Sequence, residues 1–264
     1  MSTGASSHRP GASSHRPGAT AGRLTVLGVI PARLASTRLP RKVLREIAGK
    51  PMIVRVYEGA RRSASLSELV VATDSKEVHD VCTAHGIPAV MTSPDHPSGT
   101  DRAWEVAQSH RADVYVNIQG DEPLISPAHI DALIRPFRER PDTQVSTLAI
   151  RATAEEAQSR TVNKVVCDLE GRALYFSKWA VPFDRDGRGV VRWRHLGLYA
   201  YRGEALDAYH RWPPSPLELA EGLEQLRFLE HGIQIVVEET TEPTIGVDTE
   251  EDLRAVDALF TERA

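Results

Sequence analysis

The sequence contains few cysteines, no long apolar run and no excess of positive charge, and each absence excludes a class of protein. Only Cys82 and Cys167 occur among 264 residues, each inside an apolar stretch. We therefore expect reduced core thiols, and neither a disulfide framework nor a cysteine metal site. No run approaches the roughly 18 apolar residues that span a bilayer. The net charge of −4 argues against a surface that coats nucleic acid.

The first residues also lack the apolar segment of a secretory signal peptide, so we expect a cytoplasmic protein with no membrane partner. Residues 4–10 and 11–17 are a direct repeat rich in Gly, Ser, Arg and Pro, which cannot bury enough apolar surface to become ordered. We predict that residues 1–22 form a disordered tail. The remaining residues, 23–262, are predicted to form a single domain, because an apolar fraction of 41% is ordinary for a globular protein.

The common nucleotide-binding motifs are absent: there is no P-loop and no G-x-G-x-x-G. Instead, an apolar run at residues 26–30 ends at Pro31 and is followed by a loop of small hydroxyl and cationic residues: Arg33, Ser36, Thr37, Arg38, Arg41 and Lys42. A helix is predicted to begin at Pro51. A strand, a cationic loop and a helix in this order are a layout that binds polyphosphates. The alternative is a basic surface loop that is only solvated.

From this loop onward, apolar runs alternate with segments of helical periodicity. Strands are predicted at 68–73, 87–91 and 113–118, and Ser75 is placed to cap one of the helices between them. This alternation predicts an α/β fold with a mostly parallel central sheet and flanking helices. Ligands of such sheets bind beyond the carboxyl ends of the strands. The polar residues that follow strands, and that should gather at this edge, are Arg33, Asp74, Ser98 and Asp121.

The pattern changes after residue 145. We interpret residues 145–215 as an inserted α+β subdomain, and 216–262 as the segment that completes the core. The predicted elements are strands at 145–150, 195–202 and 233–237, a hairpin at 164–176, a Gly-rich loop at 182–194, one helix whose inner face carries Leu217, Leu223, Leu226 and Leu229, and a terminal helix capped by Thr249.

Two acidic residues are the candidate metal ligands. Asp121 lies in Gln-Gly-Asp-Glu-Pro directly after a predicted strand, where Gly120 permits close approach, and Asp248 lies in Gly-Val-Asp-Thr near the other end of the chain. Mg²⁺ prefers carboxylate and phosphate oxygens. Each aspartate is also compatible with a turn or cap role. Together with the cationic loop, the two acids are the parts needed for nucleotidyl transfer, in which pyrophosphate leaves against cationic side chains.

Seven motifs, in chain order from about residue 26 to residue 262, closely resemble those of the 3-deoxy-manno-octulosonate (Kdo) cytidylyltransferases. They are Val29–Pro40, Ser98–Arg102, Gln119–Pro123, Ala173–Ser177, Arg194–Gly197, Leu223–Arg227 and Gly246–Thr249. The resemblance implies a fold of the nucleotide-diphospho-sugar transferase type, CTP and Mg²⁺ as ligands, an acidic small-molecule acceptor, and a homodimer built through residues 145–215, which also bind the acceptor.

The resemblance also implies site residues. Those with a catalytic role are Arg33, Lys42, Asp121 and Asp248, of which the two aspartates bind the metal. The expected nucleotide-binding residues are Arg33, Ser36, Thr37, Arg38, Lys42, Asp74, Ser98, Gly99, Arg102 and Gln119. The expected acceptor-binding residues are Gln119, Lys178, His195, Tyr199, Glu224 and Gln225, although Tyr199 and Gln225 also fit ordinary core and surface roles.

Two positions depart from the family pattern. Arg41 replaces a glycine, which removes conformational freedom and is expected to add a cation beside the phosphates. Lys178 replaces an arginine, and a lysine cannot reproduce the two-pronged binding of a carboxylate. Transfer of CMP to Kdo is the leading hypothesis. Transfer to a phosphonate such as phosphonoformate is the enzymatic alternative, and an inactive nucleotide-binding regulator is the non-enzymatic one.

Overall fold

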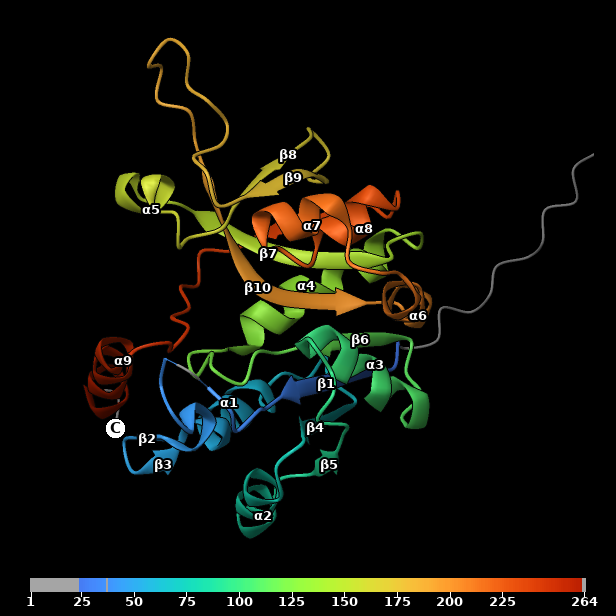
Figure 1. Ribbon diagram of the computed structural model, residues 1–264, viewed down its shortest axis with the longest axis vertical. Coiled ribbons are helices and arrows are strands. Elements are labelled where there is room, and N and C mark those ends of the chain that lie inside the picture. Colours follow the sequence, from blue (N-terminus) through green and yellow to red (C-terminus); the bar gives the residue numbers. More distant parts are fainter. Residues whose placement is uncertain (1–23, 37, 263–264) are drawn as a thin grey trace, which may run out of the picture.

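The computed structural model describes residues 24–36 and 38–262, so the predicted tail and Thr37 lie outside the described part. Within it, nine strands form one mixed sheet (Figure 1). The strands of this sheet are β1 (Val26–Pro31), β4 (Glu68–Thr73), β5 (Ala89–Met91), β6 (Val114–Asn117), β7 (Val145–Arg151), β8 (Lys164–Cys167), β9 (Ala173–Ser177), β10 (Trp193–Tyr201) and β11 (Ile235–Glu239). A small separate hairpin consists of β2 (Glu46–Ile47) and β3 (Lys50–Pro51).

The main path through the sheet has the order β11-β7-β10-β6-β1-β4-β5. Strand β10 runs antiparallel to both neighbours, whereas the pairs β6–β1, β1–β4, β4–β5 and β7–β11 are parallel. The prediction of a mostly parallel sheet is therefore confirmed. The carboxyl ends of β1 and β6 lie side by side, which brings the loops after these strands together at one edge of the sheet.

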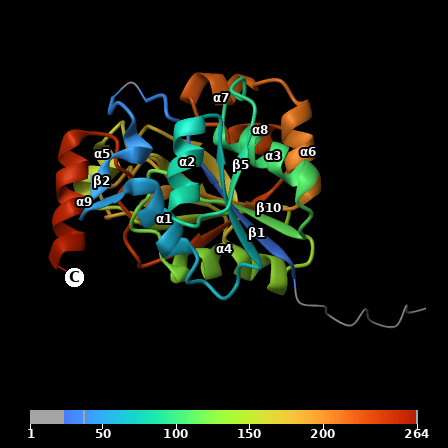
Figure 2. The same ribbon diagram turned by 90° about the horizontal axis from the view of Figure 1, so that it is seen from below.

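The helices cover both faces of the sheet. They are α1 (Met52–Ala60), α2 (Lys76–Ala84), α3 (Gly99–Ser109), α4 (Pro127–Glu139), α5 (Ala154–Gln158), α6 (Gly203–Arg211), α7 (Pro216–Glu221), α8 (Leu226–Glu230) and α9 (Glu250–Glu262), with a 3₁₀ turn, η1, at Lys42–Leu44. One apolar core joins the sheet to α1, α2, α4 and α9, and a second joins it to α3, α6 and α8. Figure 2 shows α4 and α3 on opposite sides of the sheet. No helix in the described ranges is long and apolar enough to cross a membrane.

Local sequence signals explain where several elements begin. Strand β1 is almost wholly buried, as expected for a parallel strand covered on both faces. The Ser75 hydroxyl accepts a hydrogen bond from the Val78 amide and caps α2, and Thr249 caps α9 in the same way through the Asp252 amide. Both predicted caps are thus confirmed. Cys82 is buried, as predicted for a core thiol, whereas Cys167 is only partly buried.

The single helix predicted through Leu217 and Leu229 is wrong. The chain forms α7 and α8 instead, because Gly222 adopts a left-handed conformation with φ of 63° and ends α7. Leu217 is 39% exposed and does not belong to the inner face of a continuous helix. Helices α4 and α6 were not predicted.

Residues 145–215 are not separated from the sheet. Strands β7 and β10 pair inside it, and the Val145 and Leu198 side chains are fully buried in its cores. What projects is the β8–β9 hairpin together with the loop of residues 178–192, which Figure 1 shows at one end of the molecule. The region interpreted as an inserted subdomain thus contributes two strands, β7 and β10, to the main path of the central sheet, and the hairpin within that region is where it was predicted.

Candidate active site

A cavity of about 270 Å³ opens where β1 and β6 end. We call it the cationic cavity, and its lining includes Arg33, Ser36, Lys42, Ser98, Gly99, Gln119, Gly120, Asp121 and Glu224. Seven of these nine residues were expected to bind nucleotide or metal, and they come from the loop after β1, from η1, from the start of α3 and from the loop after β6. The topology thus brings together residues that are far apart in the sequence.

Lys42 joins the two predicted metal ligands. Its Nζ lies 2.5 Å from Oδ2 of Asp121 and 2.8 Å from Oδ1 of Asp248, and Arg38 binds the other oxygen of Asp248 at 2.9 Å. Partial burial of Lys42 lowers its pKa, but the two carboxylates outweigh burial and raise the pKa of Lys42 above its usual value. The two aspartates therefore converge on one position that holds a positive charge.

The donor set of this position fits Mg²⁺. Two carboxylates that contact the same ammonium nitrogen are close enough to share one hard cation, and Mg²⁺ takes one or two protein carboxylates together with phosphate oxygens and water. No group of three or more His, Cys, Asp or Glu side chains in the described ranges is arranged to hold a metal without such outside ligands.

Backbone features bring the loop after β6 and the start of α3 to the cationic cavity. A side chain at Gly120 would place its Cβ 2.6 Å from the carbonyl oxygen of Pro31, so the two loops approach this closely only because residue 120 is a glycine, as predicted. Ser98 caps α3 by accepting a hydrogen bond from the Asp101 amide. The amino-terminal end of α3 therefore faces the cavity, where its amides and dipole favour an anion.

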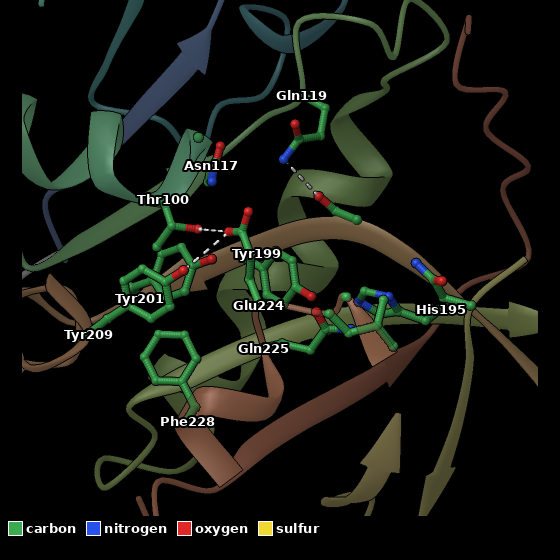
Figure 3. A pocket seen from close by; sticks show the side chains of 15 residues that line it. Thr100, Asn117, Gln119, His195, Tyr199, Tyr201, Tyr209, Glu224, Gln225 and Phe228 are labelled. Atoms are coloured by element: carbon green, nitrogen blue, oxygen red, sulfur yellow. Dashed lines mark hydrogen bonds between the residues drawn. The ribbon is translucent and has the colours of Figure 1, made fainter. Parts of the chain in front are cut away.

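A second cavity, of about 230 Å³, adjoins the first. We call it the aromatic cavity because Tyr199, Tyr201, Tyr209 and Phe228 line it, and its lining also includes Thr100, Asn117, Gln119, Asn163, His195, Glu224 and Gln225. Figure 3 shows the Tyr201 and Tyr209 rings grouped at one end and His195 at the other. Gly99, Gln119 and Glu224 line both cavities, so the two spaces meet at these residues.

Unpaired polar atoms concentrate in the aromatic cavity. In the described residues, six buried side-chain polar atoms have no hydrogen-bond partner, and four of them belong to residues that line this cavity: Asn117 Oδ1, Asn163 Oδ1, His195 Nδ1 and Gln225 Nε2. Buried polar groups are rarely left without partners, because each such group costs about 1–3 kcal/mol. The cavity therefore has the character of a site for a ligand with several polar groups.

The charge states of the aromatic cavity follow from burial. Burial lowers the pKa of His195 to about 3, so the imidazole is neutral at pH 7. Burial also raises the pKa of Tyr199 and keeps its hydroxyl protonated. The Glu224 side chain lines both cavities, where the surrounding protein reduces its solvation and raises its pKa. Hydrogen bonds of 3.3 Å from Thr100 and 3.4 Å from Tyr209 do not offset this effect.

Other residues expected at the site lie apart from the two cavities. Asp74 forms an ion pair of 2.9 Å with the fully buried Arg102, which also donates to Thr92, so this pair ties α3 to the ends of β4 and β5. Arg38 lines a third cavity, of about 570 Å³, which shares His195 with the aromatic cavity.

The two family departures lie in different surroundings. Arg41 does not extend into the cationic cavity as expected. Its backbone is left-handed, with φ of 57°, and its side chain forms an ion pair with Glu77 of α2. Lys178 lies beside Gly222 at the edge of the aromatic cavity, and its backbone amide donates to Glu221 at 2.9 Å.

Several cavity residues were missed by sequence analysis. Asn117 is a polar residue in an otherwise apolar strand and Asn163 precedes a buried lysine, so their positions offered weak signals. Thr100, Tyr201, Tyr209 and Phe228 offered none, because such residues in helices and strands ordinarily belong to a core.

Cationic side chains at the strand ends, two converging carboxylates and an adjoining polar cavity together fit a nucleotidyltransferase.

Comparisons with known proteins give the family. A family model described as cytidylyltransferase matches residues 27–235. The 3-deoxy-manno-octulosonate cytidylyltransferase of Acidobacterium capsulatum is 56% identical over 91% of this chain and 98% of its own length, and that of Koribacter versatilis is 52% identical over 92% of each. The chain therefore belongs to the 3-deoxy-manno-octulosonate cytidylyltransferase family, and the resemblance seen in the motifs is confirmed.

Solved structures agree with this assignment. A CMP:2-keto-3-deoxy-manno-octonic acid synthetase complexed with CTP superposes with a TM-score of 0.88 at 43% identity, covering 91% of this chain and all of the other. A cytidylyltransferase from Leptospira borgpetersenii has a TM-score of 0.62 at 14% identity over 90% of this chain and 87% of its own, which shows a shared fold alone.

Proposed function

We propose that this protein transfers CMP from CTP to 3-deoxy-manno-octulosonate and releases pyrophosphate. The observation that carries the proposal is the junction of the two cavities at Gly99, Gln119 and Glu224, since a triphosphate in the cationic cavity would place its α-phosphorus next to an acceptor in the aromatic cavity. The family relatives named for this reaction and the neighbour that holds CTP support it.

In this mechanism the protein mainly positions the two substrates and neutralises the charge of the phosphates. The acceptor hydroxyl oxygen forms a bond to the α-phosphorus, its proton is lost to water, and the bond from the α-phosphorus to the leaving pyrophosphate breaks. Arg33 has no ion-pair partner in the described part of the chain, which leaves its guanidinium free for the triphosphate. Arg33 and Lys42 stabilise the charge that develops on the leaving group, and the amides at the start of α3 add to this stabilisation.

Mg²⁺ is proposed as the cofactor, with Asp121 and Asp248 as its protein ligands. When bound, the ion neutralises phosphate charge and orients the triphosphate. Lys42 contacts both carboxylates, and its ammonium would be available to the phosphates when these carboxylates hold the ion. Ser36, Ser98 and Gln119 are proposed to bind the nucleotide from the walls of the cationic cavity.

The acceptor is proposed to be a polyhydroxylated acid. The four unpaired polar atoms of the aromatic cavity match a ligand with many hydroxyl groups better than a small phosphonate, which needs clustered cations. The relatives are named for the sugar acid, so the phosphonate alternative is not favoured. The inactive-regulator hypothesis is opposed by the convergence of Lys42, Asp121 and Asp248, a set that binding alone does not require.

Pyrophosphate release tests the proposal. The protein is incubated with CTP, Mg²⁺ and either 3-deoxy-manno-octulosonate or phosphonoformate, and pyrophosphate is measured over time. We expect turnover with the sugar acid only, and loss of turnover in Asp121→Ala with an unchanged circular dichroism spectrum. Turnover of phosphonoformate alone, or an unchanged rate in Asp121→Ala, would contradict the acceptor or the metal assignment, respectively.

We also propose that the chain forms a homodimer in the cytoplasm. Leu169, Leu174 and Phe183 expose 107%, 63% and 84% of their surface on the projecting hairpin and its loop, where an apolar groove of about 670 Å³ lies. Burial of this surface in a second copy would remove it from water. The free thiols support a reducing compartment. Sedimentation should show a dimer that Leu174→Asp weakens.

A further inference from the structure

Thr147 contacts His195, which lines the aromatic cavity, and lies next to an irregularity of the sheet. The register of β10 against β7 shifts between Leu196 and Tyr199, so Gly197 and Leu198 form a bulge between the pairs Leu196–Leu148 and Tyr199–Thr147. The Gly197 carbonyl accepts a hydrogen bond of 3.1 Å from the Gln119 side chain, which lines both cavities. Bulges of this kind often redirect side chains next to active sites.

The Thr147 hydroxyl has more contacts than its one proton can serve. Its Oγ1 lies 2.7 Å from the Leu198 carbonyl oxygen, 3.2 Å from that of Leu196 and 3.0 Å from Nε2 of His195. A carbonyl oxygen can only accept, and a hydroxyl carries one proton and two lone pairs. The proton is therefore directed to the bulge carbonyls, with Leu198 the nearer, and Thr147 can only accept from His195.

This proton count decides the form of His195. The neutral imidazole carries one proton, and a donor role at Nε2 leaves Nδ1 as a bare lone pair. Nδ1 is buried and has no hydrogen-bond partner among the described residues. The aromatic rings next to the imidazole, those of Phe176 and Tyr199, carry no charge. His195 lines the aromatic cavity and the third cavity, at the place where they adjoin.

We propose that Thr147 is a positioning residue that fixes the Nε2–H tautomer of His195, so that Nδ1 accepts a hydrogen bond from a hydroxyl group of the acceptor. This inference rests on the proposed function for the identity of the acceptor. It assigns His195 to hydroxyl recognition, because a lone pair repels a carboxylate. Recognition of the carboxylate then falls to donors elsewhere, such as Gln225 Nε2 and the Lys178 ammonium at the cavity edge.

The first test needs no substrate. Two-bond nitrogen–proton correlation spectra of ¹⁵N-histidine-labelled protein distinguish the two neutral tautomers, and His195→Gln identifies the signal of residue 195. We expect the Nε2–H form at pH 7 in the wild type and in Thr147→Ser, and a mixture or the Nδ1–H form in Thr147→Val. A wild-type Nδ1–H tautomer, or an unchanged Nε2–H signal in Thr147→Val, would overturn the inference.

The second test separates positioning from folding. Thr147→Val should raise the KM for 3-deoxy-manno-octulosonate about 10-fold to 100-fold, leave the KM for CTP unchanged, and be rescued by Thr147→Ser. Equal changes in both KM values would indicate a general structural role and contradict the proposal. Absence of any wild-type turnover would instead refute the proposed function, and the tautomer measurement would still judge the role of Thr147.

Discussion

Replacement of Lys42 by methionine tests the central electrostatic feature of the site. Methionine keeps most of the side-chain volume and removes the ammonium that contacts both Asp121 and Asp248. Both carboxylate oxygens contact the Lys42 nitrogen, so they lie close to each other. In the variant, the two negative charges face each other without this ammonium. Among the described residues, the cation that remains paired at this position is Arg38, whose side chain is 68% exposed.

The size of the effect follows from this geometry. Two unit charges about 5 Å apart repel by about 3 kcal/mol at an effective dielectric constant near 20. The Asp121 and Asp248 side chains are 29% and 39% exposed, so solvent screening reduces the expected loss of unfolding free energy to about 1–2 kcal/mol. For a domain of this size, the melting temperature should fall by about 2–8 °C. Loss of a cation that faces the leaving group should lower kcat by about 10²-fold to 10³-fold.

Thermal denaturation with and without Mg²⁺ provides the assay. Because the variant leaves two carboxylates without their shared ammonium, added Mg²⁺ should raise its melting temperature more than that of the wild type. Lys50→Met is the matched control, since Lys50 forms an exposed ion pair of 2.6 Å with Glu58. It should change neither stability nor turnover by much. The reasoning is refuted if Lys42→Met is as stable as the wild type and gains no more from Mg²⁺.

Three further predictions concern single positions. Arg41→Gly should raise the free energy of unfolding by up to about 1 kcal/mol, because relief of a left-handed backbone outweighs loss of the exposed pair with Glu77. The KM for CTP should stay unchanged, and a higher KM would show that Arg41 does reach the phosphates. Gly120→Ala should cost about 1–3 kcal/mol and reduce kcat, because its Cβ meets the Pro31 carbonyl oxygen at 2.6 Å; unchanged melting temperature and kcat would show that the loops move apart freely. His195 has a folded-state pKa of about 3, below its value in the unfolded chain, so the unfolded state binds the proton first as the pH falls below about 6.5. Between pH 7 and pH 5, urea denaturation should therefore show that the unfolding free energy of the wild type falls by about 2 kcal/mol relative to that of His195→Gln. Parallel stability curves would mean that the folded and unfolded states bind the His195 proton equally well, which contradicts the lowered pKa.

The parallel half of the sheet was predictable because its signals are local. The strand at 68–73 and the Ser75 cap require only nearest neighbours in the chain, and the structure has them where they were predicted. The helix predicted at 217–229 is wrong for an equally local reason, because the leucine spacing continues across Gly222, whose left-handed backbone ends α7. The placement of β7 and β10 inside the central sheet is not evident from the sequence, because a period-two pattern does not tell which strand it will join.

Residue order is enough to identify the chemical groups of the site, because a run of cations and two strand-end aspartates follow directly from it. It is also enough to identify the family, because seven motifs keep their order. Which of these groups meet depends on the tertiary fold. Lys42 contacts Asp248 across a sequence separation of 206 residues, and Arg102 is buried against Asp74 while Arg41 turns to Glu77. Side-chain direction depends on packing and on the crossing of strands, and neither property is encoded in the spacing along one segment.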